Sequence, residues 1–203
     1  MNIIFHQGDL PADVQFGKAV AVDSETMGLH PLRDRLCLLQ LSAGDGTCHL
    51  VQFADDNYSA PNLRALLTDP SILKIFHYAR FDMAMLYQYL EINVWPVYCT
   101  KIASKLVRTY TDKHGLKDLC REILGVEMSK QQQSSDWGAA ELSEDQLNYA
   151  ASDVLYLHRL QEKLDNMIDR EGRRDLLDAS LTYLQTRVQL DLKGWADEDI
   201  FHH

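Results

Sequence analysis

Residues 18–25 read Lys-Ala-Val-Ala-Val-Asp-Ser-Glu, a run of small and β-branched apolar residues that ends in two carboxylates. This composition predicts a β-strand, which Gly28 and Pro31 separate from the next element. Because side chains alternate along a strand, Asp23 and Glu25 point to the same face of the predicted sheet. Neighbouring carboxylates repel each other, and a divalent cation is the usual compensation when they are buried. A solvated strand end is the alternative interpretation of these two acids.

The rest of the chain predicts more strands first and helices last. Glycines on both sides of Asp45 mark a turn between two apolar runs, which indicates a β-hairpin. The further expected strands are Arg35–Leu41, Thr47–Phe53, Ile72–His77 and Val94–Tyr98. The expected helices are Pro61–Leu67, Phe81–Leu90, Thr100–Val107, Leu116–Leu124, Ser143–Ile168 and Arg173–Leu190. This order predicts an α/β domain with a mixed sheet of about five strands and a helical C-terminal portion.

Length and composition predict one globular domain over residues 1–203. The chain is 46% hydrophobic, and no apolar run reaches the roughly 18 residues of a membrane helix. The N-terminus lacks a basic segment followed by a long apolar stretch, so we expect a cytoplasmic protein without membrane contact. Four scattered cysteines without paired spacing are expected to be reduced thiols.

The charge distribution limits the kind of nucleic-acid contact that can be expected. A net charge of −10 argues against a protein that coats duplex phosphates by bulk charge. Residues 101–130 are locally basic, with seven Lys and Arg against four acids. This stretch can follow the phosphates of a single strand, although a solvated helix face is the commoner interpretation. The polar loop 127–138, which includes Lys130, and the acidic tail from Asp191 are expected to be loosely held.

The helix that begins near residue 143 carries the clearest local signal. Ser143 and Gln146 have the spacing of a capping box, which fixes the start of the helix. Tyr149 and Asp153 are four residues apart, so their side chains lie one turn above each other. Another acid, Asp82, follows an expected strand in the first turn of a helix, where a carboxylate interacts favourably with the helix dipole. Taken singly, each acid is also consistent with an exposed helix residue.

The combination of these elements is specific. An Asp-x-Glu strand, an aspartate at a strand–helix junction and a late Tyr-x-x-x-Asp helix together resemble the DEDD 3′–5′ exonucleases, in the subgroup with tyrosine in the third motif. Ribonuclease D, the Werner-type exonuclease domain and the proofreading domain of family A DNA polymerases belong to this subgroup. The resemblance covers about residues 18–164. It extends to motifs in the order of a ribonuclease D domain, namely Leu116-Lys-Asp-Leu119, Leu124-Gly125, Lys130, Ser135-Asp136-Trp137 and Leu142-Ser143.

The resemblance implies a ribonuclease H-like fold and a site for two divalent ions, Mg²⁺ or Mn²⁺. By position, the implied metal ligands are Asp23, Glu25, Asp82 and Asp153. Tyr149 is implied to orient the attacking water. The implied substrate contacts are Thr26, Leu29 and His77, although for the histidine a structural role in the core is the slightly favoured interpretation. Two departures concern substrate positioning: Tyr78 stands where asparagine is common, and Cys99 where ribonuclease D relatives often have aspartate.

The function implied is metal-dependent hydrolysis of single-stranded RNA from a free 3′ end, with DNA as a second option, releasing nucleoside 5′-monophosphates. Two alternatives stay open: short oligonucleotides or small phosphodiesters as substrates, and a non-catalytic nucleic-acid-binding module. The core with the motifs is expected over about residues 18–165, followed by a C-terminal helix and acidic tail over residues 171–203. We expect no additional helical nucleic-acid-binding domain, and the sequence predicts no oligomeric state.

Overall fold

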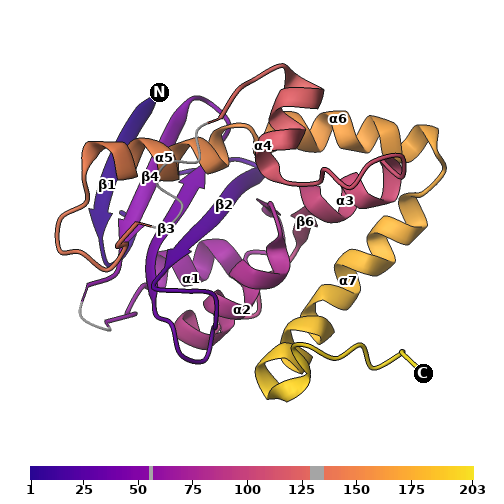
Figure 1. The fold of residues 1–203 in the computed structure, drawn as a ribbon. Helices are drawn as coiled ribbons and strands as arrows, with labels where there is room; N and C mark the ends of the chain where they lie inside the picture. Colours follow the sequence, from indigo (N-terminus) through magenta and orange to yellow (C-terminus); the bar gives the residue numbers. More distant parts are fainter. Residues whose placement is uncertain (55–56, 129–134) are drawn as a thin grey trace.

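A mixed sheet forms the centre of the fold (Figure 1). The computed structural model describes residues 1–54, 57–128 and 135–203, and within them the sheet has six strands in the order β1-β4-β3-β2-β5-β6. The strands are β1 (Asn2–Gln7), β2 (Ala19–Thr26), β3 (Leu36–Ser42), β4 (Thr47–Gln52), β5 (Leu73–Phe76) and β6 (Val97–Cys99). The pairs β2–β3 and β3–β4 are antiparallel, whereas β1–β4, β2–β5 and β5–β6 are parallel. The predicted α/β class and the hairpin of β3 and β4 are confirmed.

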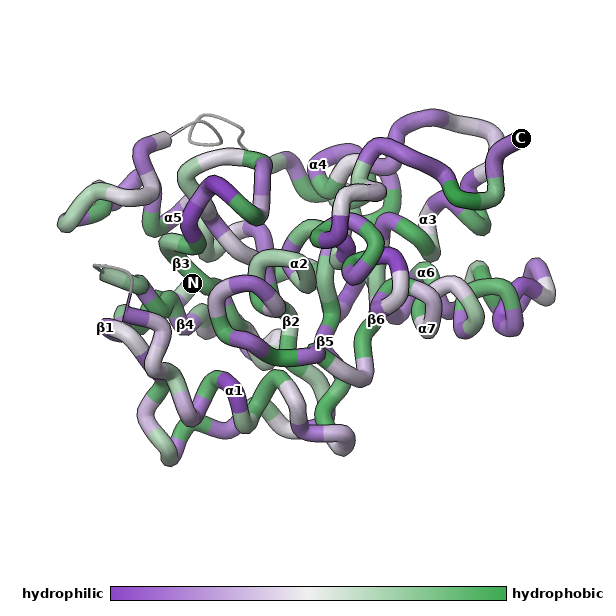
Figure 2. Tube along the Cα trace, turned by 90° about the horizontal axis from the view of Figure 1, so that it is seen from below, coloured by the Kyte–Doolittle hydropathy of each residue, from purple (hydrophilic) through white to green (hydrophobic). Residues whose placement is uncertain are grey.

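Helices cover both faces of this sheet. They are α1 (Pro61–Thr68), α2 (Ala79–Leu90), α3 (Thr100–Val107), α4 (Leu116–Leu119), α5 (Glu144–Leu155), α6 (Leu157–Arg170) and α7 (Arg174–Leu190). Helix α5 lies over β1–β4, α1 and α2 lie on the other face, and α7 packs on α2 and α3 at one side (Figure 1). Figure 2 shows apolar residues concentrated in the central strands and α2, and polar residues in most of the C-terminal segment. In the described part of the chain, no helix has the length and apolar character that crossing a membrane requires.

The first strand is the element that the sequence pattern misses. β1 lies at the sheet edge, and its residues are exposed or only partly buried, with Ile4 and Phe5 38% and 40% exposed. It is held by parallel pairing with β4 along its whole length. Because pairing rather than one buried face holds the strand, no alternation of apolar and polar residues marks it. The sheet therefore has six described strands, where about five are expected.

The long helix predicted over Ser143–Ile168 is two helices. Helix α5 ends at Leu155 and α6 begins at Leu157, with Tyr156 between them at φ −103° and ψ −6°. The break lets α5 lie on the sheet while α6 packs against α3 and β5. Periodicity alone continues across such a break because both halves keep a buried stripe.

A buried lysine fixes the loop that leads into β5. The ammonium of Lys74 donates hydrogen bonds to the carbonyls of Asp69, Ile72 and Trp95, at 2.6, 2.7 and 2.8 Å. The side chain is fully buried in the sheet. These bonds tie together two loops at the amino ends of β5 and β6, and β5 in turn leads into the helix that carries Asp82.

We expect Lys74→Met to lower the free energy of unfolding by about 3 kcal/mol, because the apolar chain leaves three buried carbonyls without a donor. Urea unfolding followed by circular dichroism measures this change. Lys18→Met, at an exposed lysine that precedes β2, is the matched control and should change the free energy by less than about 0.5 kcal/mol. A loss below 1 kcal/mol in Lys74→Met would contradict this role.

Candidate active site

Three carboxylates meet at the carboxyl end of β2. Asp23 and Glu25 point to the same face of the strand, as expected, and Asp153 approaches them from α5. One oxygen of each lies within 4.8 Å of the others. The capping box expected at Ser143 is present, with the backbone N–H of Gln146 donating to the hydroxyl of Ser143, and it fixes the start of α5. The structure thus brings together residues that are 130 positions apart in the chain.

Asp82 joins this group from the opposite side of β2. It lies in the first turn of α2, is 3% exposed, and accepts a hydrogen bond of 2.6 Å from the hydroxyl of Ser24. It is not part of the set of oxygens within 4.8 Å of one another. Its charge nevertheless raises the pKa of Glu25, and the charge of Asp23 raises the pKa of Asp82. Ser24, whose side chain alternates with those of the two acids, is therefore a site residue that the sequence pattern could have indicated.

The four carboxyl groups share an environment that disfavours negative charge. Burial raises the pKa of Asp23 to about 7, against the opposing effect of the backbone N–H of Ser24. The pKa values of Glu25, Asp82 and Asp153 lie well above the usual range, first because of burial and then because of repulsion by neighbouring carboxylates. A divalent cation would reverse both effects. Clustered carboxylate oxygens are the ligand set that Mg²⁺ and Mn²⁺ prefer, so the residues fit such ions.

Tyr149 stands one helical turn before Asp153, and the neighbouring phenol and carboxyl groups act on each other's pKa. Burial, followed by the charges of Asp153 and Glu25, raises the pKa of the phenol above its usual range, so the hydroxyl stays neutral. The ring lies against Trp137, with a centroid distance of 6.1 Å, and Trp137 is only 2% exposed. Trp137 is therefore a packing residue beside Tyr149.

The carboxylates open into a cleft of about 720 Å³. The three expected substrate contacts, Thr26, Leu29 and His77, all line it. Leu29 is 85% exposed. The hydroxyl of Thr26 donates a hydrogen bond to the carbonyl of Gly28. Lys130, named with the ribonuclease D motifs and the basic stretch, lies outside the described residues, as does half of the loop 127–138, residues 129–134.

Tyr78 and Lys101 are in contact at the rim of this cleft, a pair that the sequence pattern does not indicate. The ammonium of Lys101 lies 4.2 Å from the centroid of the Tyr78 ring, a cation–π contact. Tyr78 has a left-handed backbone conformation, with φ 69° and ψ 43°, where it precedes α2. Asparagine tolerates this conformation better than tyrosine does, which gives a physical reason for the asparagine common at this position. No spacing rule relates residues 78 and 101, so the pairing needs the fold.

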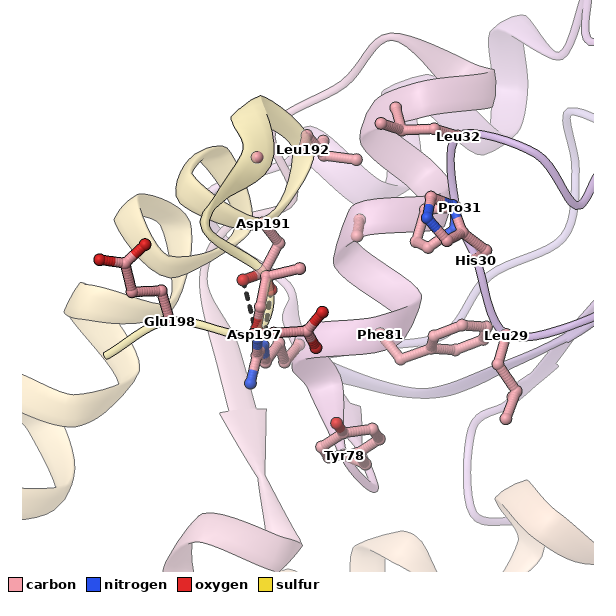
Figure 3. A pocket seen from close by; sticks show the side chains of 14 residues that line it. Leu29, His30, Pro31, Leu32, Tyr78, Phe81, Asp191, Leu192, Asp197 and Glu198 are labelled. Carbon is pink, nitrogen blue, oxygen red and sulfur yellow. Dashed lines mark hydrogen bonds and ion pairs between the residues drawn. The ribbon is translucent and has the colours of Figure 1, made fainter. Parts of the chain in front are cut away.

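A second cavity of about 780 Å³ adjoins the cleft and shares Leu29, Tyr78 and Phe81 with it. Figure 3 shows these residues on one side and Asp191, Asp197 and Glu198 of the C-terminal segment on the other. The segment is not loosely held at its start, contrary to expectation. Two arginines attach it. Arg80 donates hydrogen bonds to Asp191 and to the carbonyl of residue 196, and Arg187 donates to Asp191 and to the carbonyls of residues 195 and 198.

Comparison with known proteins identifies the family. A family model described as 3′–5′ exonuclease matches residues 8–169, which include all of the carboxylates and Tyr149. The chain belongs to the 3′–5′ exonuclease family. Ribonuclease D of Gluconacetobacter diazotrophicus is 33% identical over 166 residues, which are 81% of this chain and 42% of that protein. Exosome complex component 10 of Rattus norvegicus is 33% identical over 169 residues, 82% of this chain and 18% of that protein. The chain thus spans about two fifths or less of these curated family members.

Solved structures of the family show the same fold. Brucella melitensis NrnC with bound Mg²⁺ is 53% identical, covers the full length of both chains and has a TM-score of 0.96. Brucella melitensis NrnC bound to pGG is 54% identical, covers 100% of this chain and 99% of that chain, and has a TM-score of 0.97. Escherichia coli RNase D is 27% identical over 85% of this chain and 45% of its own, with a TM-score of 0.75. The ribonuclease H-like architecture expected of the family is confirmed.

Proposed function

We propose that this chain is a divalent-metal-dependent exonuclease that hydrolyses single-stranded RNA from its 3′ end and releases nucleoside 5′-monophosphates. The observation that carries the proposal is the meeting of Asp23, Glu25 and Asp153 within 4.8 Å, with Asp82 beside them. Four clustered carboxylates without a cation would repel a phosphodiester, so the proposal includes divalent metal ions.

Two Mg²⁺ or Mn²⁺ ions held by the four carboxylates would offset their charge of −4 and supply an activated water and a Lewis acid for in-line displacement. The chain's own residues have separate tasks. Asp153 and Tyr149 lie on one helix, so the phenol can hydrogen-bond a water beside the carboxylates without adding charge. Lys101 brings a positive charge to the rim of the same cleft, where a phosphate oxygen would lie.

We expect Tyr149→Phe to lower kcat by about 10- to 100-fold with little change in KM, because it removes one orienting hydrogen bond and no charge. Steady-state hydrolysis of a short RNA in Mg²⁺ measures both constants. Tyr110→Phe, at a tyrosine that is 77% exposed, serves as the matched control and should keep the kcat of the unmodified protein. An unchanged kcat in Tyr149→Phe would remove the phenol from the mechanism.

Short oligonucleotides are a second candidate substrate class, and two observations favour them. NrnC, similar to this chain over its full length, has been solved with pGG, a two-nucleotide ligand. In addition, Asp197 and Glu198 line the cavity next to the cleft, close to Leu29 and Tyr78. Carboxylates in that position would repel the phosphates of a longer strand that ran through this cavity.

One experiment separates these possibilities. RNA and DNA of identical sequence, as 5′-labelled dinucleotides and 20-mers, are incubated with the protein in Mg²⁺, Mn²⁺ or EDTA, with Asp153→Asn as the inactive control. A metal-dependent ladder that shortens from the 3′ end of the 20-mer supports the proposed exonuclease. Cleavage confined to dinucleotides supports the second candidate. Absence of cleavage and of metal binding by calorimetry would favour a non-catalytic binding module.

A further inference from the structure

His77 lies beside the carboxylate strand, at the end of β5. Strands β2 and β5 pair in parallel with Ala21 opposite Ile75. Asp23 lies two residues after Ala21 in β2, and His77 directly follows the last residue of β5, so both stand toward the carboxyl end of these two parallel strands. Both residues line the cleft of about 720 Å³. His77 therefore lines the same cleft into which the proposed metal ligands open.

Two hydrogen bonds define the protonation of the imidazole. The hydroxyl of Thr100 donates its single proton to the carbonyl of Phe76 at 3.2 Å. Its oxygen can then only accept from Nδ1 of His77, which lies 2.9 Å away. Burial and the nearby charge of Lys101 lower the pKa of His77 to about 3, so the ring is neutral near pH 7. A neutral ring with its proton on Nδ1 has a lone pair on Nε2.

Because this lone pair can only accept a hydrogen bond, the partner of Nε2 must be a proton donor. Nδ1 is directed to Thr100, and the side chain of His77 is only partly buried, which leaves the Nε2 edge to the cleft. Phosphate oxygens carry no proton and cannot pair with Nε2. On a nucleotide whose 5′-phosphate lies at the carboxylates, the proton donors nearest to that phosphate are the ribose hydroxyls, because the base donors lie farther out.

We propose that Nε2 of His77 accepts a hydrogen bond from a ribose hydroxyl of the 3′-terminal nucleotide. His77 is then a specificity residue for the sugar. This inference rests on the proposed function, because it places a terminal nucleotide in the cleft. The 2′-hydroxyl distinguishes RNA from DNA, and the 3′-hydroxyl distinguishes a free end from a 3′-deoxy end. A substrate that lacks the bonded hydroxyl leaves Nε2 unpaired, which should lower kcat/KM by about 10- to 100-fold.

The test compares short RNAs that end in a ribo-, 2′-deoxy- or 3′-deoxynucleotide. The variants are His77→Phe, which keeps an aromatic ring without an acceptor, and His77→Gln, whose amide oxygen can reach the place of Nε2. We expect the unmodified protein to disfavour one of the two deoxy ends by about 10- to 100-fold. His77→Phe should reduce that preference to within about threefold by slowing the ribo substrate, and His77→Gln should restore part of it. The matched control is His6→Phe, on the far edge strand β1, which should keep the preference.

The outcomes separate this inference from the proposed function. If the unmodified protein cleaves none of the RNAs in Mg²⁺ or Mn²⁺, the proposed function is wrong. If it cleaves them without preference, or if His77→Phe keeps the preference against the deoxy end, only the inference is overturned. Should His77→Phe not fold, ¹⁵N NMR of the histidine rings in the unmodified protein decides: a proton on Nδ1 supports the inference, and a proton on Nε2 overturns it.

Discussion

Asp23→Asn is expected to lower exonuclease activity by at least about 10³-fold, equivalent to about 4 kcal/mol in the activation barrier. The substitution keeps the size of the side chain and removes one of the charges that hold the divalent ions. Asp23 stands between Glu25, Asp153 and Asp82, and its charge acts on the pKa of each of them. No other carboxyl group in the cluster has this central position.

The same substitution should stabilise the metal-free protein. The pKa of Asp23 is raised to about 7 by burial, so above pH 7 its charge opposes folding. Removing that charge also relieves repulsion on its three neighbours. We expect the melting temperature in EDTA at pH 7.5 to rise by about 4–8 °C, corresponding to about 2 kcal/mol. Added Mg²⁺ should then stabilise the variant much less than the unmodified protein.

Activity assays and thermal unfolding with and without Mg²⁺ measure both effects in one preparation. Asp13→Asn, at an exposed aspartate before β2, is the matched control and should leave activity and metal response unchanged. Two results would contradict the assignment: full activity in Asp23→Asn, or a fall in the melting temperature of the metal-free variant. The opposite signs expected for activity and apo stability distinguish loss of a ligand from loss of the fold.

The sequence predicts the carboxylate strand because its signal is local. Strand period alone puts Asp23 and Glu25 on one face, and helix period alone stacks Tyr149 under Asp153. Neither periodicity predicts that the pair on the strand and the pair on the helix lie close together in the fold. The family resemblance supplied this, and the structure now gives the physical reason: α5 crosses the face of β2 and β3. Asp82, in contrast, reaches the site from the other side of β2 and is held there by Ser24.

Residues that depend on sheet register could not be predicted. Gln40 interrupts an apolar strand, and the sequence gives no reason for it. In the structure it stands directly opposite Asp23 on β3 and is fully buried, and its amide has no hydrogen-bond partner among the described residues. The attachment of the C-terminal segment is similar. It depends on Arg80 reaching Asp191 across 111 positions, and an acidic composition alone predicts a solvated tail.

The apo protein is expected to lose stability as the pH rises from 6.5 to 8. A carboxyl group whose pKa is raised in the folded state keeps a proton there that the unfolded chain has already released. Folding therefore takes up protons, and stability falls with rising pH until the folded pKa is passed. For Asp23 this window runs from its ordinary value of 3.8 to about 7, and for the other three carboxyl groups of the cluster it reaches well above their ordinary values.

Other titratable groups limit the pH range in which the carboxylates alone determine how stability changes with pH. Histidines with lowered pKa, His77 above all, make stability rise with pH below about 6.5, which opposes the carboxylates. Lys74, whose pKa burial lowers to about 8, makes stability rise above that value. Between pH 6.5 and 8 the carboxylates act alone among these groups. One proton taken up on folding corresponds to a slope of about 1.4 kcal/mol per pH unit, or about 3–5 °C.

Thermal unfolding in EDTA at several pH values between 6.5 and 8 measures this slope. Saturating Mg²⁺ should remove or invert it, because the ion binds the deprotonated carboxylates and so favours folding more strongly as protons leave. Asp23→Asn should make the slope in EDTA shallower, whereas Asp13→Asn should keep it. A melting temperature in EDTA that stays level or rises over this range would mean that the four carboxyl groups are not held together without metal. The site would then be assembled by the ion rather than preformed by β2, α2 and α5.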